Sequence, residues 1–248
     1  MPSLLSIAAV LISAASLVAA VPTEKVPRIV GGSPAPAEHA KIVLSSSNNG
    51  QKGCQAVLIG PKTAISPRNC FLTPLSNYTL RTGSLKWNSG GTILEIESQV
   101  LHPEPPGLEG NIAVLRLKTA IEGKGIVYGK LPAQDADPAP GTRLMVSGWG
   151  ETTPGGSPSS TLRTLQASTL AHQDCGNKWM GKRIVYSDDL CASGASGKYA
   201  SDGDRGSPLF DPSTGIVYGF LIRSGLGEHP DLYTDIARLS DWIKSHMA

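Results

Sequence analysis

The stretch DGDRGSPLF, residues 202–210, has the spacing of a loop that presents a nucleophile. In a loop of the form Gly-Asp-Ser-Gly-Gly-Pro, the serine hydroxyl stands between backbone amides and is free to attack a bound substrate. Here the position of that serine holds Arg205, between Asp204 and Gly206. Whether the stretch belongs to such a loop depends on the landmarks in the rest of the chain.

The composition is that of a globular protein with many turns. The chain has 248 residues, of which 40% are hydrophobic, and it contains 28 Gly and 19 Pro. This length allows one large domain or two joined halves with a sizeable core. The formal charge of +2 comes from 22 basic and 20 acidic residues without a long run of one sign, so we expect no nucleic-acid partner.

Residues 1–20 (MPSLLSIAAVLISAASLVAA) are apolar, uncharged and end in small residues. This pattern predicts a signal peptide and therefore a secreted, extracellular protein with no membrane association after signal removal. A membrane anchor or a buried helix is the alternative, which the four serines and the missing basic flank disfavour. A short polar stretch, residues 21–28, follows and ends in Arg28, and we interpret it as a propeptide.

From residue 29 onward, short apolar runs alternate with Gly, Pro, Ser and Asn, which predicts strands and turns. The predicted strands are 41–44, 54–59, 78–82, 92–100, 112–117, 143–148, 162–169 and 215–222. Residues 131–141 (LPAQDADPAPG) have the composition of a linker and divide these strands into two sets of similar size. We therefore expect two all-β halves.

The last residues, TDIARLSDWIKSHMA (234–248), have the spacing of an amphipathic helix. Apolar residues recur at intervals of three and four and so share one helix face: Ile236, Leu239, Trp242 and Ile243. Thr234 is the predicted N-cap, because its side-chain oxygen can accept a hydrogen bond from a backbone N–H of the first turn.

The four cysteines fall in two pairs of equal spacing: Cys54 with Cys70, and Cys175 with Cys191. Four cysteines permit three pairings, and the residues alone do not choose among them. In an oxidising compartment two local disulfides are the expected outcome, whereas a zinc site lacks the usual CxxC or HxxxH spacing. We expect no metal and no cofactor. Asn77 begins the one glycosylation sequon, Asn-Tyr-Thr.

Seven landmarks in order along the chain resemble the trypsin-like (chymotrypsin-fold) serine protease family. They are the junction 28–32 (RIVGG), the pair Cys54 and Cys70, the run from His102-Pro103 to 111–115 (NIAVL), then 146–150 (VSGWG), 190–192 (LCA), the loop 202–210 and 230–234 (PDLYT). The resemblance extends from Ile29 to His246. It implies an all-β fold of two six-stranded antiparallel β-barrels, at about residues 29–135 and 136–248, with a C-terminal α-helix. It also implies the disulfide Cys54–Cys70, and we predict Cys175–Cys191 beside it.

The resemblance places the three catalytic positions of the family on residues with the wrong chemistry. The histidine position is Asn69, the aspartate position is Asn111 and the nucleophile position is Arg205. The family mechanism needs a serine hydroxyl, an imidazole that takes its proton and a carboxylate that orients the imidazole. An amide does not titrate near neutral pH and a guanidinium stays protonated, so we predict that the chain has no catalytic residue.

No histidine of the chain occupies a catalytic position of the family. The five are His39, His102, His172, His229 and His246, and we expect each at an ordinary surface or loop position. Ser207, two residues beyond Arg205, is the candidate for a relocated nucleophile, but it needs a base.

The resemblance further implies an altered specificity pocket and an activation site. Four pocket positions differ from those of the family: Tyr199 stands at the floor, Arg223 and Ser224 stand on the wall, and Asp231 replaces a pocket glycine. Two explanations account for these substitutions: drift of the sequence after catalysis was lost, and active remodelling of the pocket. Cleavage between Arg28 and Ile29 is expected to release an α-amine at Ile29 that forms a buried ion pair with Asp204.

We interpret the chain as a secreted serine protease homologue without a catalytic triad that acts by protein binding, as an inhibitor, cofactor or decoy of another secreted enzyme. The expected partner is a protein, namely a secreted enzyme, a protease inhibitor or a host protein, and the chain itself is expected to be a monomer. Two alternatives stay open: a serine endopeptidase or other hydrolase with a relocated nucleophile, and a storage protein without a defined partner.

Overall fold

The computed structural model describes residues 29–72, 74–103, 110–153, 155–201 and 203–248. The predicted signal peptide (1–20), the predicted propeptide (21–28) with its cleavage residue Arg28, and Asp202 lie outside the described residues. Within the described ranges, no helix is long and apolar enough to cross a membrane.

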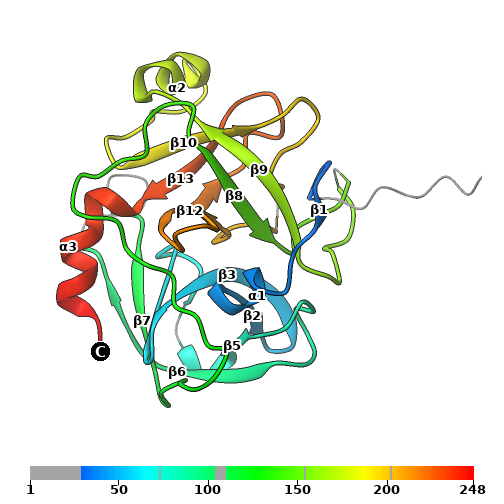
Figure 1. Ribbon diagram of the computed structural model, residues 1–248, viewed down its shortest axis with the longest axis vertical. Coiled ribbons are helices and arrows are strands. Elements are labelled where there is room, and N and C mark those ends of the chain that lie inside the picture. Colours follow the sequence, from blue (N-terminus) through cyan, green and yellow to red (C-terminus); the bar gives the residue numbers. More distant parts are fainter. Residues whose placement is uncertain (1–28, 73, 104–109, 154, 202) are drawn as a thin grey trace, which may run out of the picture.

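Six strands of the N-terminal half form a closed antiparallel barrel, in the lower part of Figure 1. They are joined in the order β2 (Val43–Asn48), β3 (Gln51–Gly60), β4 (Thr63–Ser66), β7 (Ala113–Leu117), β6 (Thr92–Leu101) and β5 (Tyr78–Thr82). Side chains of a strand alternate between its two faces, so one face of each strand supplies the core. Leu58, Leu80 and Leu115 are fully buried there, and each contributes about 2 kcal/mol by its removal from water.

The C-terminal half forms a second antiparallel barrel, in the upper part of Figure 1. Its strands follow the order β9 (Arg163–Thr169), β10 (Asp189–Gly194), β13 (Asp231–Asp235), β12 (Val217–Arg223), β11 (Pro208–Phe210) and β8 (Arg143–Gly148). Pairing of β8 with β9 closes the ring, and β1 (Ser33–Pro34) adds a short strand to β9. The prediction of an all-β fold with two six-stranded barrels is confirmed.

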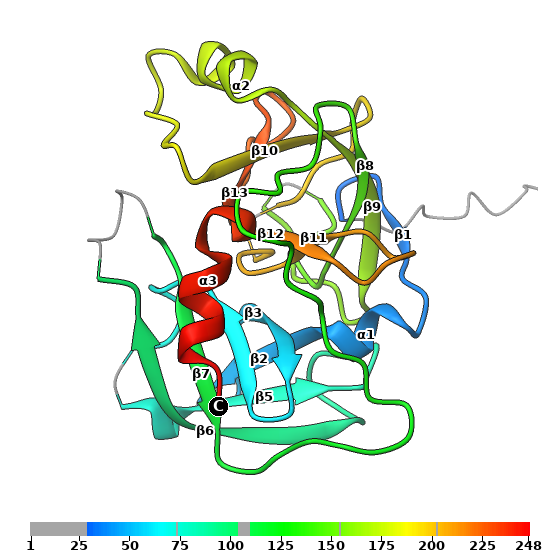
Figure 2. The ribbon, with the colours of Figure 1, turned by 60° about the vertical axis from the view of Figure 1, so that its left-hand side comes forward.

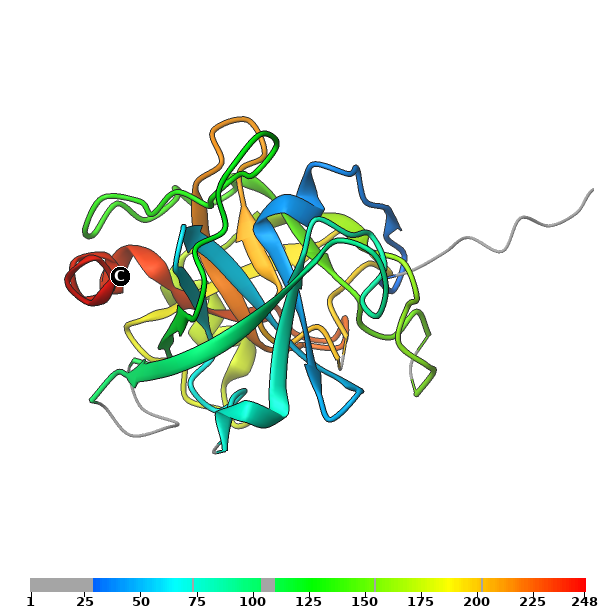
Figure 3. The same ribbon diagram turned by 90° about the horizontal axis from the view of Figure 1, so that it is seen from below.

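An apolar cluster joins the two barrels. It combines Val57, Ile65 and Val114 of the first barrel with Phe220 and Leu232 of the second. The C-terminal helix α3 (Ile236–His246) adds Ile236, Leu239 and Ile243 to the same cluster. In Figures 2 and 3 this helix lies outside the first barrel and runs along it. The shared cluster fixes one barrel against the other, so loops from both can meet at a defined site.

The C-terminal helix is confirmed, but its N-cap is Asp235 and the prediction of Thr234 is wrong. The Asp235 carboxylate accepts a hydrogen bond from Ala237 N at 2.9 Å. Thr234 still belongs to β13, where it pairs with Phe220, and its hydroxyl donates to the carbonyl of Asn111 at 3.2 Å. The strand runs directly into the helix, so the cap falls one residue later than the apolar spacing suggested.

Both disulfides have the predicted pairing. Cys54–Cys70 joins β3 to the turn after β4, and Cys175–Cys191 joins β10 to helix α2 (His172–Trp179). All four cysteines of the chain are therefore paired. Each bond links residues 16 positions apart, and a loop of this length contributes about 3 kcal/mol by restricting the unfolded chain.

Two short elements remain, α1 (His39–Ile42) and the single 3-10 turn η1 (Leu75–Asn77). Asn77 ends η1 and is half-buried. Its glycosylation stays a prediction.

Candidate functional site

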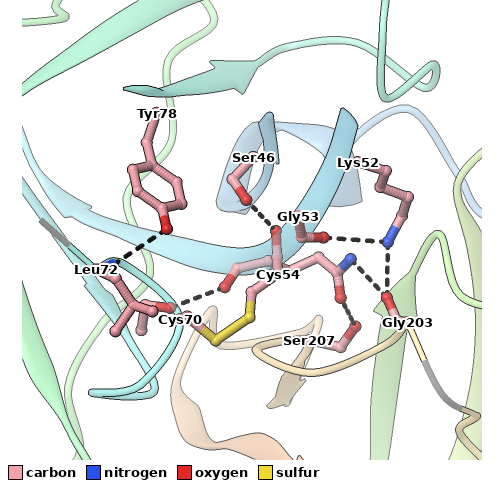
Figure 4. The surroundings of a disulfide bond; sticks show 11 residues. Ser46, Lys52, Gly53, Cys54, Cys70, Leu72, Tyr78, Gly203 and Ser207 are labelled. Carbon is pink, nitrogen blue, oxygen red and sulfur yellow. Dashed lines mark hydrogen bonds between the residues drawn. A yellow bond between two sulfur atoms is a disulfide. The ribbon is translucent and has the colours of Figure 1, made fainter. Parts of the chain in front are cut away.

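The loop that carries Arg205 rests on strand β3 of the first barrel through one buried glutamine. The Gln55 backbone N–H donates to the carbonyl of Arg205 at 2.7 Å, and its side-chain Nε2 donates to the carbonyl of Gly203 at 3.0 Å. The Ser207 hydroxyl donates to Gln55 Oε1 at 2.9 Å. Figure 4 shows Gly203 and Ser207 of this loop beside the Cys54–Cys70 disulfide. Gln55 is fully buried, so this loop is fixed from the opposite barrel.

The close approach of loop and strand requires glycine at position 206. Gly206 has φ +87°, in the left-handed region, and a Cβ added to it would lie 1.9 Å from the Gln55 carbonyl oxygen. Its N–H donates to Leu221 O at 2.8 Å, which also ties the loop to β12. This geometry turns the Arg205 side chain outward, where it is exposed.

The two asparagines of the catalytic positions lie at the end of the first barrel that faces this loop. Strands β4 and β7 pair antiparallel with Ser66 opposite Ala113. Asn69 follows β4 in an exposed turn, and Asn111 comes two residues before Ala113. The backbone of Asn111 is held by Thr234 of the second barrel, and its Oδ1 is buried without a donor among the described residues. Both asparagines therefore stand at the same end of the β4–β7 pair, and the backbone of Asn111 is tied to the second barrel.

Ser207, the candidate for a relocated nucleophile, is fully buried. Its hydroxyl donates to the Gln55 amide oxygen, and its backbone carbonyl accepts from Leu221 N at 2.8 Å. An amide oxygen cannot take the hydroxyl proton at neutral pH, so this contact holds the hydroxyl without activating it.

The expectation that every histidine lies at an ordinary surface or loop position is wrong for His39. This residue begins α1 and is 7% exposed. Its Nδ1 lies 2.8 Å from the hydroxyl of Ser147, which is itself fully buried and bonded to Thr164. Burial lowers the pKa of His39, against a smaller raising influence of Glu38. The Ser147 hydroxyl has no access to solvent, so this histidine–serine pair is a structural contact.

Asp204, the carboxylate before Arg205, is fully buried and hydrogen-bonded. It accepts from Gly150 N at 2.7 Å and from the Ser201 N–H and hydroxyl, both at 3.0 Å. Burial raises its pKa, against the lowering influence of these bonds and of Lys52. In the continuous chain the Ile29 nitrogen is a peptide nitrogen, so the predicted ion pair between Ile29 and Asp204 concerns the cleaved form and stays a prediction.

Lys52 is a charged residue of the site that the sequence did not single out. It stands on β3, two residues before Cys54, and its Nζ donates to the carbonyls of Gly203 at 2.7 Å and Gly53 at 3.3 Å, as drawn in Figure 4. Burial lowers its pKa to about 8, against the raising influence of Asp204. Lys52 therefore supplies a positive charge near Asp204 before any cleavage.

The four predicted pocket residues fall into two separate cavities. Arg223 and Ser224 line a cavity of about 260 Å³ together with Arg205. Tyr199 and Asp231 line another of about 110 Å³. The region that the resemblance treats as one specificity pocket is therefore divided in this chain.

Asp231 is almost fully buried, at 2% exposed, and serves as an acceptor for two backbone amides. Its carboxylate accepts from Gly225 N at 2.7 Å and Ala200 N at 3.1 Å. Burial raises its pKa to about 7, and these hydrogen bonds oppose the shift. Its side chain therefore ties the loop after β12 to the segment that contains Ala200.

Replacement of Asp231 by asparagine should change stability in a pH-dependent way. The folded pKa of about 7 lies above the unfolded value of about 3.9, so the folded protein holds the proton longer. The wild type therefore loses stability as the pH rises from about 4 through 7. We expect the free energy of unfolding of Asp231→Asn, measured in urea, to rise by about 2 kcal/mol relative to wild type between about pH 5 and pH 8. If the difference in the free energy of unfolding between Asp231→Asn and wild type does not change with pH, the raised pKa of Asp231 is contradicted.

Comparisons of the sequence with known proteins agree with the fold described above. The family model described as Trypsin matches residues 29–243. Trypsin alpha-4 of Lucilia cuprina is 29% identical over 241 residues, which cover 93% of each chain. Trypsin 5G1 of Aedes aegypti is 29% identical over 227 residues, 88% of this chain and 84% of the relative.

Two solved structures have the same fold. Neuropsin, a serine protease expressed in mouse brain, superposes with a TM-score of 0.77 at 23% identity, over 88% of this chain and 99% of its own. Human heparin binding protein superposes with a TM-score of 0.75 at 23% identity, over 87% of this chain and 95% of its own.

Proposed function

Because this chain belongs to the trypsin family, we propose that it is a secreted member without proteolytic activity that acts by binding a protein partner. One observation carries the proposal. Arg205, at the nucleophile position, is exposed, while the Ser207 hydroxyl two residues later is fully buried and bonded to an amide. A guanidinium cannot attack a carbonyl, and the serine cannot reach one.

The remaining catalytic positions support the same proposal. By resemblance, Asn69 and Asn111 hold the positions where the family mechanism needs a base and a carboxylate, and neither amide can accept a proton at neutral pH. A hydrolase with a relocated nucleophile requires a base within hydrogen-bond reach of a serine. No described contact gives Ser207 such a partner, so we do not favour the hydrolase.

Several kinds of binding role fit the chain. An inhibitor, a cofactor or a decoy of another secreted enzyme would each use the surface around the former active site, and a monomer is sufficient for all three. The fold also occurs in a protein named for the heparin it binds, which supports a binding role without identifying the ligand of this chain.

Processing after Arg28 belongs to the same proposal. Ile29 and Asp204 are both fully buried, and in this proposal the Asp204 carboxylate neutralises the new α-amine of Ile29. The buried charges cost several kcal/mol if left unpaired, and cleavage would therefore fix the loop more firmly.

Site-specific photocrosslinking tests the binding role. A benzophenone amino acid replaces the exposed Asn69 in one variant and the exposed Arg143, at the far end of β8, in a control. Each variant is incubated in the medium into which the protein is secreted, and crosslinked products are identified by mass spectrometry. We expect one defined partner from position 69 and none from position 143. Substrate hydrolysis without any crosslinked partner would contradict the proposal.

A further inference from the structure

The cavity of about 260 Å³ beside Arg205 has two walls of different origin. One wall is the loop with Gly203 and Arg205, and the other is the end of β12 with Leu221 and Arg223. The two arginines therefore line one cavity, Arg205 from the loop before β11 and Arg223 from the end of β12, and the lining also includes the buried, apolar Leu221.

The charge of this cavity is positive and uncompensated within the described part of the chain. Its described lining residues include two arginines, Arg205 and Arg223, and no acidic residue. Neither Arg205 nor Arg223 forms an ion pair with a described residue, and the nearby Asp204 and Asp231 are buried and accept backbone N–H groups. Guanidinium groups beside low-dielectric protein favour an anion with two acceptor oxygens.

Arg223 is already held in place. Its guanidinium carbon lies 5.8 Å from the centre of the Trp179 ring on α2. Trp179 is 4% exposed and donates from Nε1 to Pro230 O at 3.1 Å, so the ring is fixed. A cation stacked on a fixed ring loses less freedom on binding than a free arginine, which favours an anion at this position.

The size of the cavity selects the kind of ligand. Sites for small organic ligands are usually about 300 to 1,000 Å³, and this cavity is smaller. It has room for one side chain of a larger molecule that binds over it. A short acidic side chain fits both the volume and the charge.

We propose that this cavity binds the carboxylate of a glutamate or aspartate side chain on the protein partner, between Arg205 and Arg223. The inference rests on the proposed binding function and adds the chemistry of the group that is recognised. The partner then inserts one acidic residue into the cavity and covers the exposed Asn69 turn with its surroundings.

Titration with two capped peptides tests the inference. The probes are acetyl-Gly-Ser-Glu-Leu-Ser-Gly-amide and the same peptide with Gln in place of Glu, added to isotopically labelled protein and followed by NMR. We expect the Glu peptide to bind at least tenfold more tightly and to shift the side-chain N–H signals of Arg205 and Arg223. Arg205→Gln and Arg223→Gln should each weaken binding about tenfold, while Arg143→Gln, which removes an exposed arginine elsewhere, should not change it.

Further measurements make the outcomes separable. Melting temperatures establish that the variants are folded, and Arg205→Lys should retain part of the affinity because it keeps the charge but loses the two-pronged contact. Equal affinity for the two peptides, or tighter binding of a sulfated disaccharide than of the Glu peptide, would overturn the inference. If the partner crosslinks equally well to Arg205→Gln, the carboxylate site is wrong while the binding role stands.

Discussion

Purified protein cleaved after Arg28 is expected to hydrolyse peptide and ester substrates no faster than buffer alone. Loss of the members of a catalytic triad lowers kcat by about a millionfold, and here Asn69, Asn111 and Arg205 replace all three. The assay is release of a chromophore from amide and thioester substrates with basic, aromatic and small side chains. Hydrolysis that disappears in Ser207→Ala would contradict the prediction, because it would identify that serine as the nucleophile.

Restoration of the triad should recover little activity. The triple variant Asn69→His, Asn111→Asp and Arg205→Ser supplies the three groups, but the neighbouring pocket remains divided. Without a pocket that positions the substrate, the restored groups lack the orientation on which rate enhancement depends. We expect kcat/KM far below that of an active relative in the same assay. A triple variant that matches an active relative would show that pocket shape is unimportant here.

The largest loss of stability is expected from Gly206→Ala. The added Cβ would meet the Gln55 carbonyl oxygen at 1.9 Å, and the three nearest atoms all belong to the Gln55 backbone, so no flexible side chain can move aside. The alanine must also adopt φ +87°, a backbone conformation that is unfavourable for a residue with a Cβ. We expect a decrease of about 3 to 5 kcal/mol in the free energy of unfolding, because the loop must separate from β3. Urea denaturation at fixed pH measures it.

Gly215→Ala is the matched control. Gly215 has a similar φ of +77°, but nothing lies within 4 Å of the Cβ position. The free energy of unfolding of Gly215→Ala should therefore decrease by about 1 to 2 kcal/mol, which is the conformational cost alone. The difference between the two variants therefore measures the contact of the loop with Gln55. Equal losses would show that the loop is not pressed against β3 as described.

The fold could be predicted because it depends on repeated local patterns. Alternating apolar residues, as in the run around Leu94 and Ile96, marked one core face of a strand, and both residues are buried. The cysteine spacing and the apolar face of the C-terminal helix are also local patterns, so they too could be recognised in the sequence. Short elements escaped, because three-residue β11 and four-residue β4 are too brief for any period to be visible. Helix α2 has buried residues only at Cys175 and Trp179, a single repeat of the helical spacing.

The site was predictable in sequence position but not in its contacts. The loop around Arg205 was located by its Gly-Asp frame, whereas Gln55 and Lys52, which hold that loop, come from a strand about 150 residues earlier. Such long-range partners leave no local signal. The buried position of His39 was missed for the same reason, since its partner Ser147 lies 108 residues away.

Labelling with a fluorophosphonate tests the central claim most directly, because the reagent bonds only to an activated serine. The protein cleaved after Arg28 is incubated with excess reagent beside an active trypsin, and the intact masses are measured. The account predicts full labelling of the trypsin and no added mass on this chain, since Arg205 cannot react and Ser207 is buried. One equivalent of added mass on this chain, mapped to Ser207 or any other serine, would show that it is an enzyme after all.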